Sequence, residues 1–492
     1  MTGTITRSYD GLDRLISEAS SRGSVSYSYD AAGRRTSMTV SGQAPVTYQY
    51  DNANRLTQIT QGSASVVIAP DSDGRRQSVT LPNGVTMTYN YDAASQLTGI
   101  NFTLGGNTLG NLTYGYDLAG RRANVGGSFA RTGMPNALAS ASYNANNQLT
   151  QFGGASLTYD ANGNLTSDGT NTYTWNARNQ LVSISGGVAA NFQYDAFGRR
   201  VSKTIGGTTQ YVYDGVNPVQ EISGTTASPN LLTGGVDEYF QRTDSASARN
   251  YLTDALGSTL GLADSTGAIQ TSYTYEPFGN TSVSGASTTN SFAFTGRELD
   301  APNLYFYRAR YYSPQSQRFI SEDPLMLVGG TNLYAYTNND AITFIDPFGT
   351  DKKRRRECHD IYQSAVYGNY IGNKLLPQFS LLSYIPPVGP WPGNGHTQES
   401  YLELPLLAAK GVGVRYLAAA AAENAATGNF LLALSRLGTP LSGTIAAQGE
   451  ATLTTAGLQG TAAAGAEALG YIGLAAVVAA TAQDIVAWAH CW

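Results

Sequence analysis

The chain has 492 residues, with a hydrophobic share of 41% and a charged share of 13%, about half the usual charged share of a soluble domain. Its 30 basic and 35 acidic residues give a net charge of −5, which argues against electrostatic binding of nucleic acid by the whole chain. Two cysteines and three scattered histidines exclude a disulfide framework and provide no zinc-site spacing. The sequence therefore predicts no metal site and no cofactor.

A Tyr-Asp motif recurs along the first 200 residues, as in YDAAGRRT from Tyr29 and YDNANRLT from Tyr50. Before each Tyr, segments such as VTYQY (46–50) alternate with the period of two that is typical of a strand. The Asp and the Gly or Asn that follow favour a tight turn. We therefore predict stacked β-hairpins, one for each repeat. The copies begin at Tyr9, Tyr29, Tyr50, Pro70, Tyr91, Tyr116, Tyr143, Tyr159, Trp175 and Tyr194.

The Tyr, Asp and Arg of the motif have two interpretations. They could form a surface that binds sugar or nucleic acid, or they could pack between hairpins and organise the turns. We favour packing, because a motif that returns in every unit is more simply explained as part of the architecture than as ten copies of one site.

Two longer segments follow the repeats: YLTDALGSTLGLADSTGAIQTSYTYEPFGN from Tyr251, and GRELDAPNLYFYRARYYSPQSQRFISEDPLMLVGGTNLYAYTNNDAITFIDPFG from Gly296 to Gly349. With the repeats, they resemble the Rhs, or YD-repeat, family of bacterial toxins over about residues 1–350. The resemblance implies a mostly β fold in which hairpins spiral into a shell, or partial cocoon. The expected domains are the YD-repeat shell (1–250) and the Rhs-associated core (251–350).

Members of this family cut themselves just after the second of two Asp-Pro motifs, which here are Asp323-Pro324 and Asp346-Pro347. The resemblance implies an aspartyl autoprotease, in which one carboxyl group acts as a base and another as an acid. The alternative is that both Asp-Pro pairs are structural turns. The candidate catalytic residues are Asp323, Asp346, Asp300 and Arg318. The expected cleavage positions are Gly349, Thr350 and Asp351.

Three residues depart from the family pattern around this boundary, and one of them, Ser313, replaces the acid often found after Arg-Tyr-Tyr. Met326 stands where the family has Gly, and Thr350 stands where the family has an apolar residue at the cut. Both substitutions bear on whether the scissile bond is correctly placed.

The composition changes after residue 350. Residues 351–398 are expected to form a basic linker and Pro/Gly-rich loops. The run DKKRRRE is either a nucleic-acid contact or a solvated linker. Residues 399–492 are Ala-rich and predict a mainly α C-terminal region. Its longest apolar stretch, Ala468 to Gln483, is shorter than the roughly 20 residues of a membrane span.

The resemblance implies an Rhs-family toxin or toxin fragment that acts in interbacterial competition or host attack. The shell would encapsulate the chain's own C-terminal domain as cargo and would itself bind no nucleic acid. Further partners would be a cognate immunity protein and an N-terminal shell or delivery component. The protein would be cytoplasmic before export, then secreted or at the cell surface by a route without a visible signal peptide. The alternative is a non-toxic structural or cell-surface YD-repeat protein with a docking or membrane-anchoring helical C-terminus.

Overall fold

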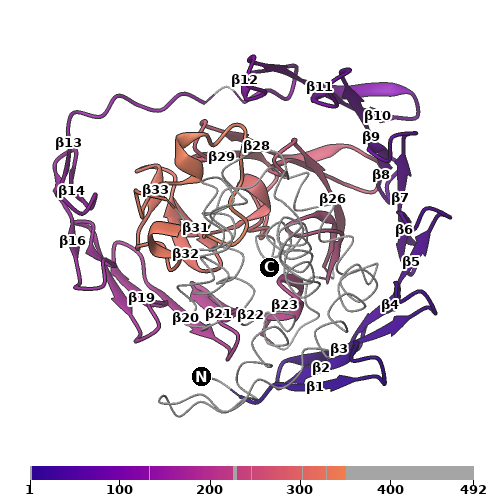
Figure 1. Cartoon of the computed structure of the whole chain (residues 1–492), viewed down its shortest axis with the longest axis horizontal. Helices are drawn as coiled ribbons and strands as arrows, with labels where there is room; N and C mark the ends of the chain where they lie inside the picture. The colour runs from indigo at the N-terminus through magenta and orange to yellow at the C-terminus, as the bar shows by residue number, and fades with distance from the viewer. Residues whose placement is uncertain are drawn as a thin grey trace, which may run out of the picture. The chain divides into compact units, whose positions relative to one another are not determined.

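The computed structural model describes residues 3–350, apart from residues 132, 225–229, 245–246, 302 and 329. These residues lie within one compact unit, Met1–Asn369, and their strands form four antiparallel sheets (Figure 1). The prediction of a mostly β fold is confirmed. The predictions for residues 351–492, which include Asp351 and the Ala-rich helices, fall outside the described residues.

The first sheet has twelve strands in chain order, so each strand pairs with the next. This is the arrangement expected of consecutive hairpins. The strands are β1 (Thr6–Tyr9), β2 (Leu15–Ser20), β3 (Gly23–Tyr29), β4 (Arg35–Val40), β5 (Val46–Tyr50), β6 (Leu56–Gln61), β7 (Ala64–Pro70), β8 (Arg76–Thr80), β9 (Thr86–Tyr91), β10 (Leu97–Leu104), β11 (Asn107–Tyr116) and β12 (Arg122–Gly126).

The second and third sheets continue the same order. The three-stranded sheet contains β13 (Ala141–Tyr143), β14 (Leu149–Phe152) and β15 (Ala155–Ser156). The fourteen-stranded sheet contains β16 (Thr158–Tyr159), β17 (Leu165–Ser167), β18 (Asn171–Trp175), β19 (Leu181–Gly186), β20 (Ala190–Tyr194), β21 (Arg200–Ile205), β22 (Gly207–Asp214), β23 (Asn217–Ser223), β24 (Asn230–Thr233), β25 (Tyr239–Thr243), β26 (Ala248–Thr253), β27 (Thr259–Ala263), β28 (Ile269–Tyr275) and β29 (Thr281–Gly285). The domain boundary predicted at 250/251 falls inside β26, so the hairpin sheet continues across it.

The fourth sheet has four strands: β30 (Glu298–Ala301), β31 (Leu304–Tyr307), β32 (Arg310–Ser313) and β33 (Arg318–Phe319). Three short 3-10 turns accompany it, η1 (Phe294–Gly296), η2 (Met326–Val328) and η3 (Thr337–Asn339). None of the helical turns in the described ranges could span a bilayer.

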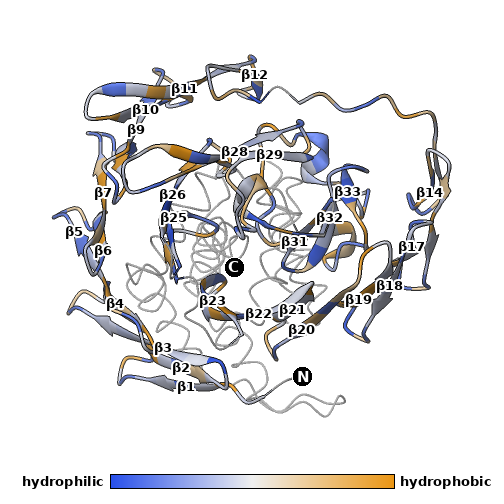
Figure 2. Ribbon diagram, turned by 180° about the vertical axis from the view of Figure 1, so that it is seen from behind, coloured by the Kyte–Doolittle hydropathy of each residue, from blue (hydrophilic) through white to orange (hydrophobic). Residues whose placement is uncertain are grey.

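The alternation in the sequence decides which face of each hairpin is buried. In β3, Val25 and Tyr27 are buried while their neighbours Ser26 and Ser28 are exposed. Strand β5 repeats the pattern, with Val46 and Tyr48 buried. Successive side chains of a strand point to opposite faces, so one apolar row is covered and the other row stays at the surface. Figure 2 shows the hydrophilic turns at the hairpin ends.

The Asp of the motif closes each turn, as the hairpin starting at Asp30 shows. Its Oδ1 atom accepts the backbone N–H of Arg34 (2.8 Å), and its carbonyl oxygen accepts the N–H of Gly33 (3.0 Å). Gly33 has φ +81°, a left-handed conformation that a side chain would strain. The side chain of Arg34 then returns to Asp30, with Nε 2.6 Å from Oδ2.

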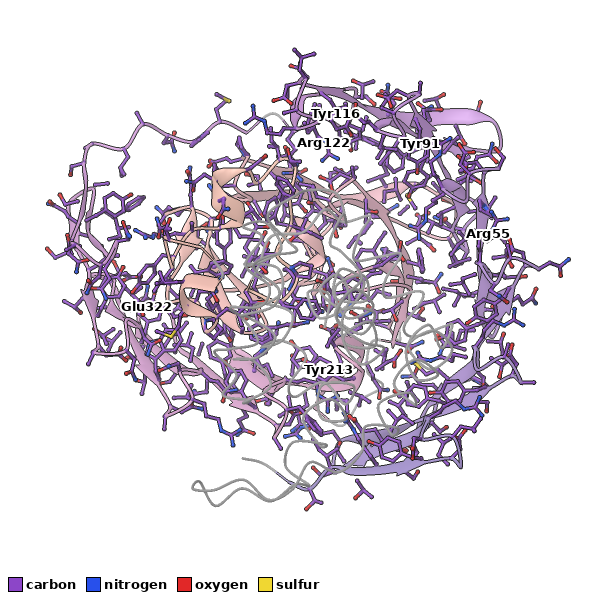
Figure 3. The ribbon with its side chains drawn as sticks, viewed as in Figure 1. Arg55, Tyr91, Tyr116, Arg122, Tyr213 and Glu322 are labelled. Carbon is purple, nitrogen blue, oxygen red and sulfur yellow. The ribbon has the colours of Figure 1, made fainter. Side chains whose placement is uncertain are left out.

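The motif Tyr joins one hairpin to the preceding one. The hydroxyl of Tyr29 donates to the carbonyl oxygen of Leu15 (2.7 Å), and Arg14 covers its half-buried ring, with Cζ 4.8 Å from the ring centre. The same hydroxyl-to-carbonyl bond recurs at Tyr50, Tyr91, Tyr116, Tyr194 and Tyr213; three of these residues are labelled in Figure 3. The packing interpretation of the repeated Tyr, Asp and Arg is therefore confirmed.

Later hairpins pack against the first sheet. One core cluster joins residues of β3–β11 to residues of β22–β27, and β23 and β26 lie inside the arc of β1–β12 in Figure 1. Asp214 at the end of β22 accepts bonds from Tyr27 (3.0 Å) and Arg35 (2.6 Å), which lie 187 and 179 residues earlier. The chain therefore spirals back on itself.

The four-stranded sheet packs between two further clusters. Tyr305, Tyr307 and Tyr312 belong to a core shared with β24–β28, whereas Leu304, Phe306 and Tyr311 pack against β17–β20. Because alternate residues of one strand serve opposite sides, the sheet is held from both faces. This four-stranded sheet carries part of the candidate site.

Candidate active site

Each Asp-Pro motif starts a tight turn. At Asp323, Oδ1 accepts the N–H of Leu325 (2.8 Å) and the carbonyl oxygen accepts the N–H of Met326 (2.8 Å). At Asp346, Oδ1 accepts the N–H of Thr350 (2.9 Å) and the carbonyl oxygen accepts the N–H of Gly349 (3.3 Å). Both Asp residues are buried, with exposed fractions of 5% and 2%. The second turn contains the Gly349–Thr350 peptide bond, the predicted cleavage position.

Arg310 in β32 brings the two turns together. Its Nη2 atom lies 2.9 Å from Oδ2 of Asp323 and 3.5 Å from Oδ2 of Asp346. Its Nε atom donates to the carbonyl oxygen of Gly349, and Nη1 donates to that of Leu333 (2.8 Å). One guanidinium thus contacts both carboxylates and the carbonyl of the predicted scissile bond.

Arg310 was not among the residues predicted from the sequence. The available signal was its position in LYFYRARYY, where Arg308 and Arg310 stand within a segment that is otherwise aromatic or apolar and therefore expected to be buried. A buried cation requires an acidic partner. The sequence could have identified the residue as buried and paired, but not the two acids that it binds.

The two carboxyl groups share the guanidinium of Arg310. Burial lowers the pKa of Arg310 from its ordinary value, while Asp346 and Asp323 act in the opposite direction. Two carboxyl groups that share one cation can hold a single proton between them. Such a pair can provide a base and an acid at once.

Backbone conformation is unusual at the fourth residue of both turns. Gly349 has φ +68° and Met326 has φ +53°, both in the left-handed region. A Cβ atom at Gly349 would collide with the carbonyl oxygen of Tyr307 and lie 3.1 Å from the backbone nitrogen of Arg310. Met326 therefore adopts the conformation that glycine adopts readily, at the position where the family pattern has Gly.

The two other predicted catalytic residues have different partners. Asp300 pairs with Arg200 and, at 3.1 Å, with Lys203, in a buried cluster that also contains Glu298. Arg318 lies against the rings of Tyr143 and Tyr334 and donates to the carbonyl oxygen of Asn147. We therefore leave Asp300 and Arg318 out of the mechanism. In the described ranges, no group of three or more His, Cys, Asp or Glu residues is placed to hold a metal ion.

In a comparison with known families, residues 85–342 match the Teneurin YD-shell family, and this match spans more than half of the chain. The chain belongs to the Teneurin YD-shell family. Residues 9–44 also match the RHS repeat. The predicted relationship to Rhs and YD-repeat proteins is confirmed.

The curated relatives include several toxins. The chain is 31% identical over 173 residues to the tRNA nuclease WapA of Bacillus subtilis, which covers 32% of this chain and 7% of WapA. It is 35% identical over 105 residues to the toxin subunit YenC1 of Yersinia entomophaga, covering 20% of this chain and 11% of YenC1. The double-stranded DNA deaminase toxin A of Burkholderia cenocepacia is 27% identical over 201 residues, covering 34% and 14%. The matched segments are thus a small part of each relative.

Solved structures share the fold of the shell. The crystal structure of TcdB2-TccC3-Cdc42 has a TM-score of 0.54 at 18% identity and covers 70% of this chain and 23% of that chain. The Tc holotoxin pore of Photorhabdus luminescens has a TM-score of 0.52 at 19% identity, covering 67% and 21%. The YD-shell described here is therefore a fold found in Tc toxins.

Proposed function

We propose that this chain is a toxin shell that cuts its own backbone between Gly349 and Thr350, separating the shell from the segment that follows. The observation that carries the proposal is that Arg310 contacts the carboxyl groups of Asp323 and Asp346 and also the carbonyl oxygen of Gly349. A structural turn explains each Asp separately. It does not explain why a buried guanidinium joins both acids to one carbonyl group.

The mechanism assigns one role to each side chain. Asp323 acts as the base and takes a proton from water as the water oxygen attacks the carbonyl carbon of Gly349. Arg310 Nε already bonds that carbonyl oxygen and stabilises the negative charge that develops on it. In the intact chain, Asp346 Oδ1 accepts the N–H of Thr350 at 2.9 Å, which places the carboxyl group beside the leaving nitrogen. Attack of water makes that nitrogen pyramidal and basic, and the protonated Asp346 carboxyl group then supplies its proton as the C–N bond breaks. The products are a carboxylate at Gly349 and an amine at Thr350.

The fate of the released segment follows from the same proposal. Several relatives are named as toxins, which supports a role for residues 351–492 as the cargo of the shell. A cognate immunity protein and a delivery component are then the expected partners, and the site of action lies outside the producing cell. Expression of residues 351–492 alone should arrest bacterial growth. Harmless accumulation would favour a structural or cell-surface YD-repeat protein.

The cleavage step is tested with the purified full chain. The wild-type chain should yield two pieces whose junction, read by mass spectrometry, lies between Gly349 and Thr350. Asp323→Asn and Asp346→Asn should each leave one intact chain, because an amide cannot exchange the required proton. Asp51→Asn is the matched control: it removes a carboxylate from a similar turn and should leave cleavage unchanged. A wild-type chain that stays whole contradicts the proposal.

A further inference from the structure

Six repeats share one arrangement of Asp with an Arg four residues later. In each, Oδ1 of the Asp accepts the backbone N–H of the Arg at 2.8–3.0 Å. Oδ2 accepts the Nε atom of the same Arg at 2.6–2.7 Å. The pairs are Asp10/Arg14, Asp30/Arg34, Asp51/Arg55, Asp71/Arg75, Asp117/Arg121 and Asp195/Arg199.

The turn at the predicted cut shares two hydrogen bonds with the repeat turns, since the carbonyl oxygen of Asp346 accepts the N–H of the residue three positions later. Oδ1 of Asp346 accepts the N–H of Thr350, four residues later, at 2.9 Å. The residue between them with a left-handed conformation is Gly349, as Gly33 is in the repeat turn that starts at Asp30. The site is thus a YD-type turn in which Thr stands at the position of Arg.

The difference lies in the source of the cation. In the repeats, the turn's own Arg binds Oδ2 of the Asp. At Asp346, Oδ2 instead lies 3.5 Å from Nη2 of Arg310, which belongs to another strand and also binds Asp323. Other turns show that the backbone does not need the Arg: Gln96 and Asn164 stand at this position and still donate their N–H to Asp92 and Asp160 at 2.8 and 2.9 Å.

We propose that residue 350 determines whether this turn is reactive, because an Arg there would bind Asp346 in place of Arg310 and convert the site into an ordinary repeat turn. The inference rests on the proposed self-cleavage. An adjacent Arg favours the ionised form of a carboxyl group, so Asp346 would then be a poor proton donor. Arg310 would also lose one of the contacts that fix its guanidinium against the Gly349 carbonyl.

The test compares variants at position 350 in the full chain. Pulse-labelled cell-free synthesis followed by a chase gives the rate of cleavage over a range of pH. Thr350→Arg should cut at least tenfold more slowly than wild type, and its residual rate should rise as the pH falls, because protonation of Asp346 then needs more acid. Thr350→Met, with a long uncharged side chain, should cut at least tenfold faster than Thr350→Arg, and its rate should not show the added rise at low pH.

The outcomes separate the two claims. If Thr350→Arg cuts at the wild-type rate, the inference is overturned while the proposed function stands. If Thr350→Arg and Thr350→Met are slowed equally at every pH, side-chain size explains the effect and the inference is again overturned. A wild-type chain that stays whole overturns the proposed function, and this inference with it.

Discussion

The guanidinium carbon of Arg310 lies 3.6 Å from the centre of the Phe319 ring, which is itself 1% exposed. The ring covers one face of the guanidinium. The N–H groups at the edges of the guanidinium contact Asp323, Asp346 and Gly349. A cation held over an aromatic face in a desolvated site gains about 2 kcal/mol. Phe319 therefore fixes the plane in which Arg310 meets these three residues and the carbonyl oxygen of Leu333.

We expect Phe319→Leu to slow self-cleavage about tenfold, because the loss of roughly 1.4 kcal/mol of orientation corresponds to that factor. Phe319→Tyr keeps an aromatic face and should restore most of the rate. The control is Phe294→Leu, which removes an equally buried ring from the same core cluster, where the ring lies over Arg131 rather than Arg310. If Phe294→Leu slowed cleavage as much, general packing would explain the effect. Rates are measured by pulse-chase synthesis.

Gly349→Ala tests the close approach of the scissile turn to β31 and β32. The added Cβ would collide with the carbonyl oxygen of Tyr307, so the turn must shift away from Arg310. We expect cleavage to fall at least a hundredfold, since displacement of a reacting group by about 1 Å has that effect. Gly62→Ala is the control: it has φ +58° and nothing within 4 Å of the new Cβ, so it adds backbone strain alone and should leave cleavage intact. Equal loss in both variants would contradict the explanation.

Met326→Gly should stabilise the chain. Met326 has a left-handed φ of +53°, which is strained for a residue with a side chain, so glycine relieves this backbone strain. Because 64% of the surface of Met326 is exposed, the substitution loses little buried apolar area. The expected gain in unfolding free energy is roughly 0.5–1 kcal/mol after the added entropy of the unfolded chain. Denaturant titration of the Asp346→Asn chain measures it without cleavage. Met134→Gly, at an exposed residue whose φ is not positive, should be neutral or destabilising; a similar gain there would refute the strain argument.

Acid should weaken the buried cluster around Glu298. Burial by itself raises the pKa of Glu298. The positive charges of Arg200, Lys203 and Arg297 have a larger, opposite effect, and the resulting pKa is about 2. Because the folded pKa is below the ordinary value of about 4.5, the stabilisation is present above pH 4.5 and is lost as the pH falls toward 2. Glu298→Gln should therefore be much less stable than wild type at pH 7, with a difference that shrinks between pH 4.5 and 2. A difference that stays constant over this range would contradict the assignment.

The amino-acid sequence alone determined the repeating part of this protein. A period of two, an Asp-x-x-Gly turn and a spacing of about 20 residues are local properties, and each hairpin forms from neighbouring residues. The same reasoning explains why Asp323 and Asp346 could be named in advance, since each begins an Asp-Pro turn that is visible in the sequence. Met326 and Thr350 also stood out there as departures from the family pattern.

Only the tertiary structure decided which of these residues meet. Asp300 and Arg318 were candidates beside Asp323, but their positions in the packed sheets give them Arg200 and Tyr334 as neighbours. Arg310 joins Asp323 and Asp346 because β32 lies beside both turns, a contact that depends on how the core folds back on the shell. Local periodicity specifies each hairpin. The partner of a buried charge depends on strands that are distant in the chain, and a short-range sequence pattern does not specify which distant strands come into contact.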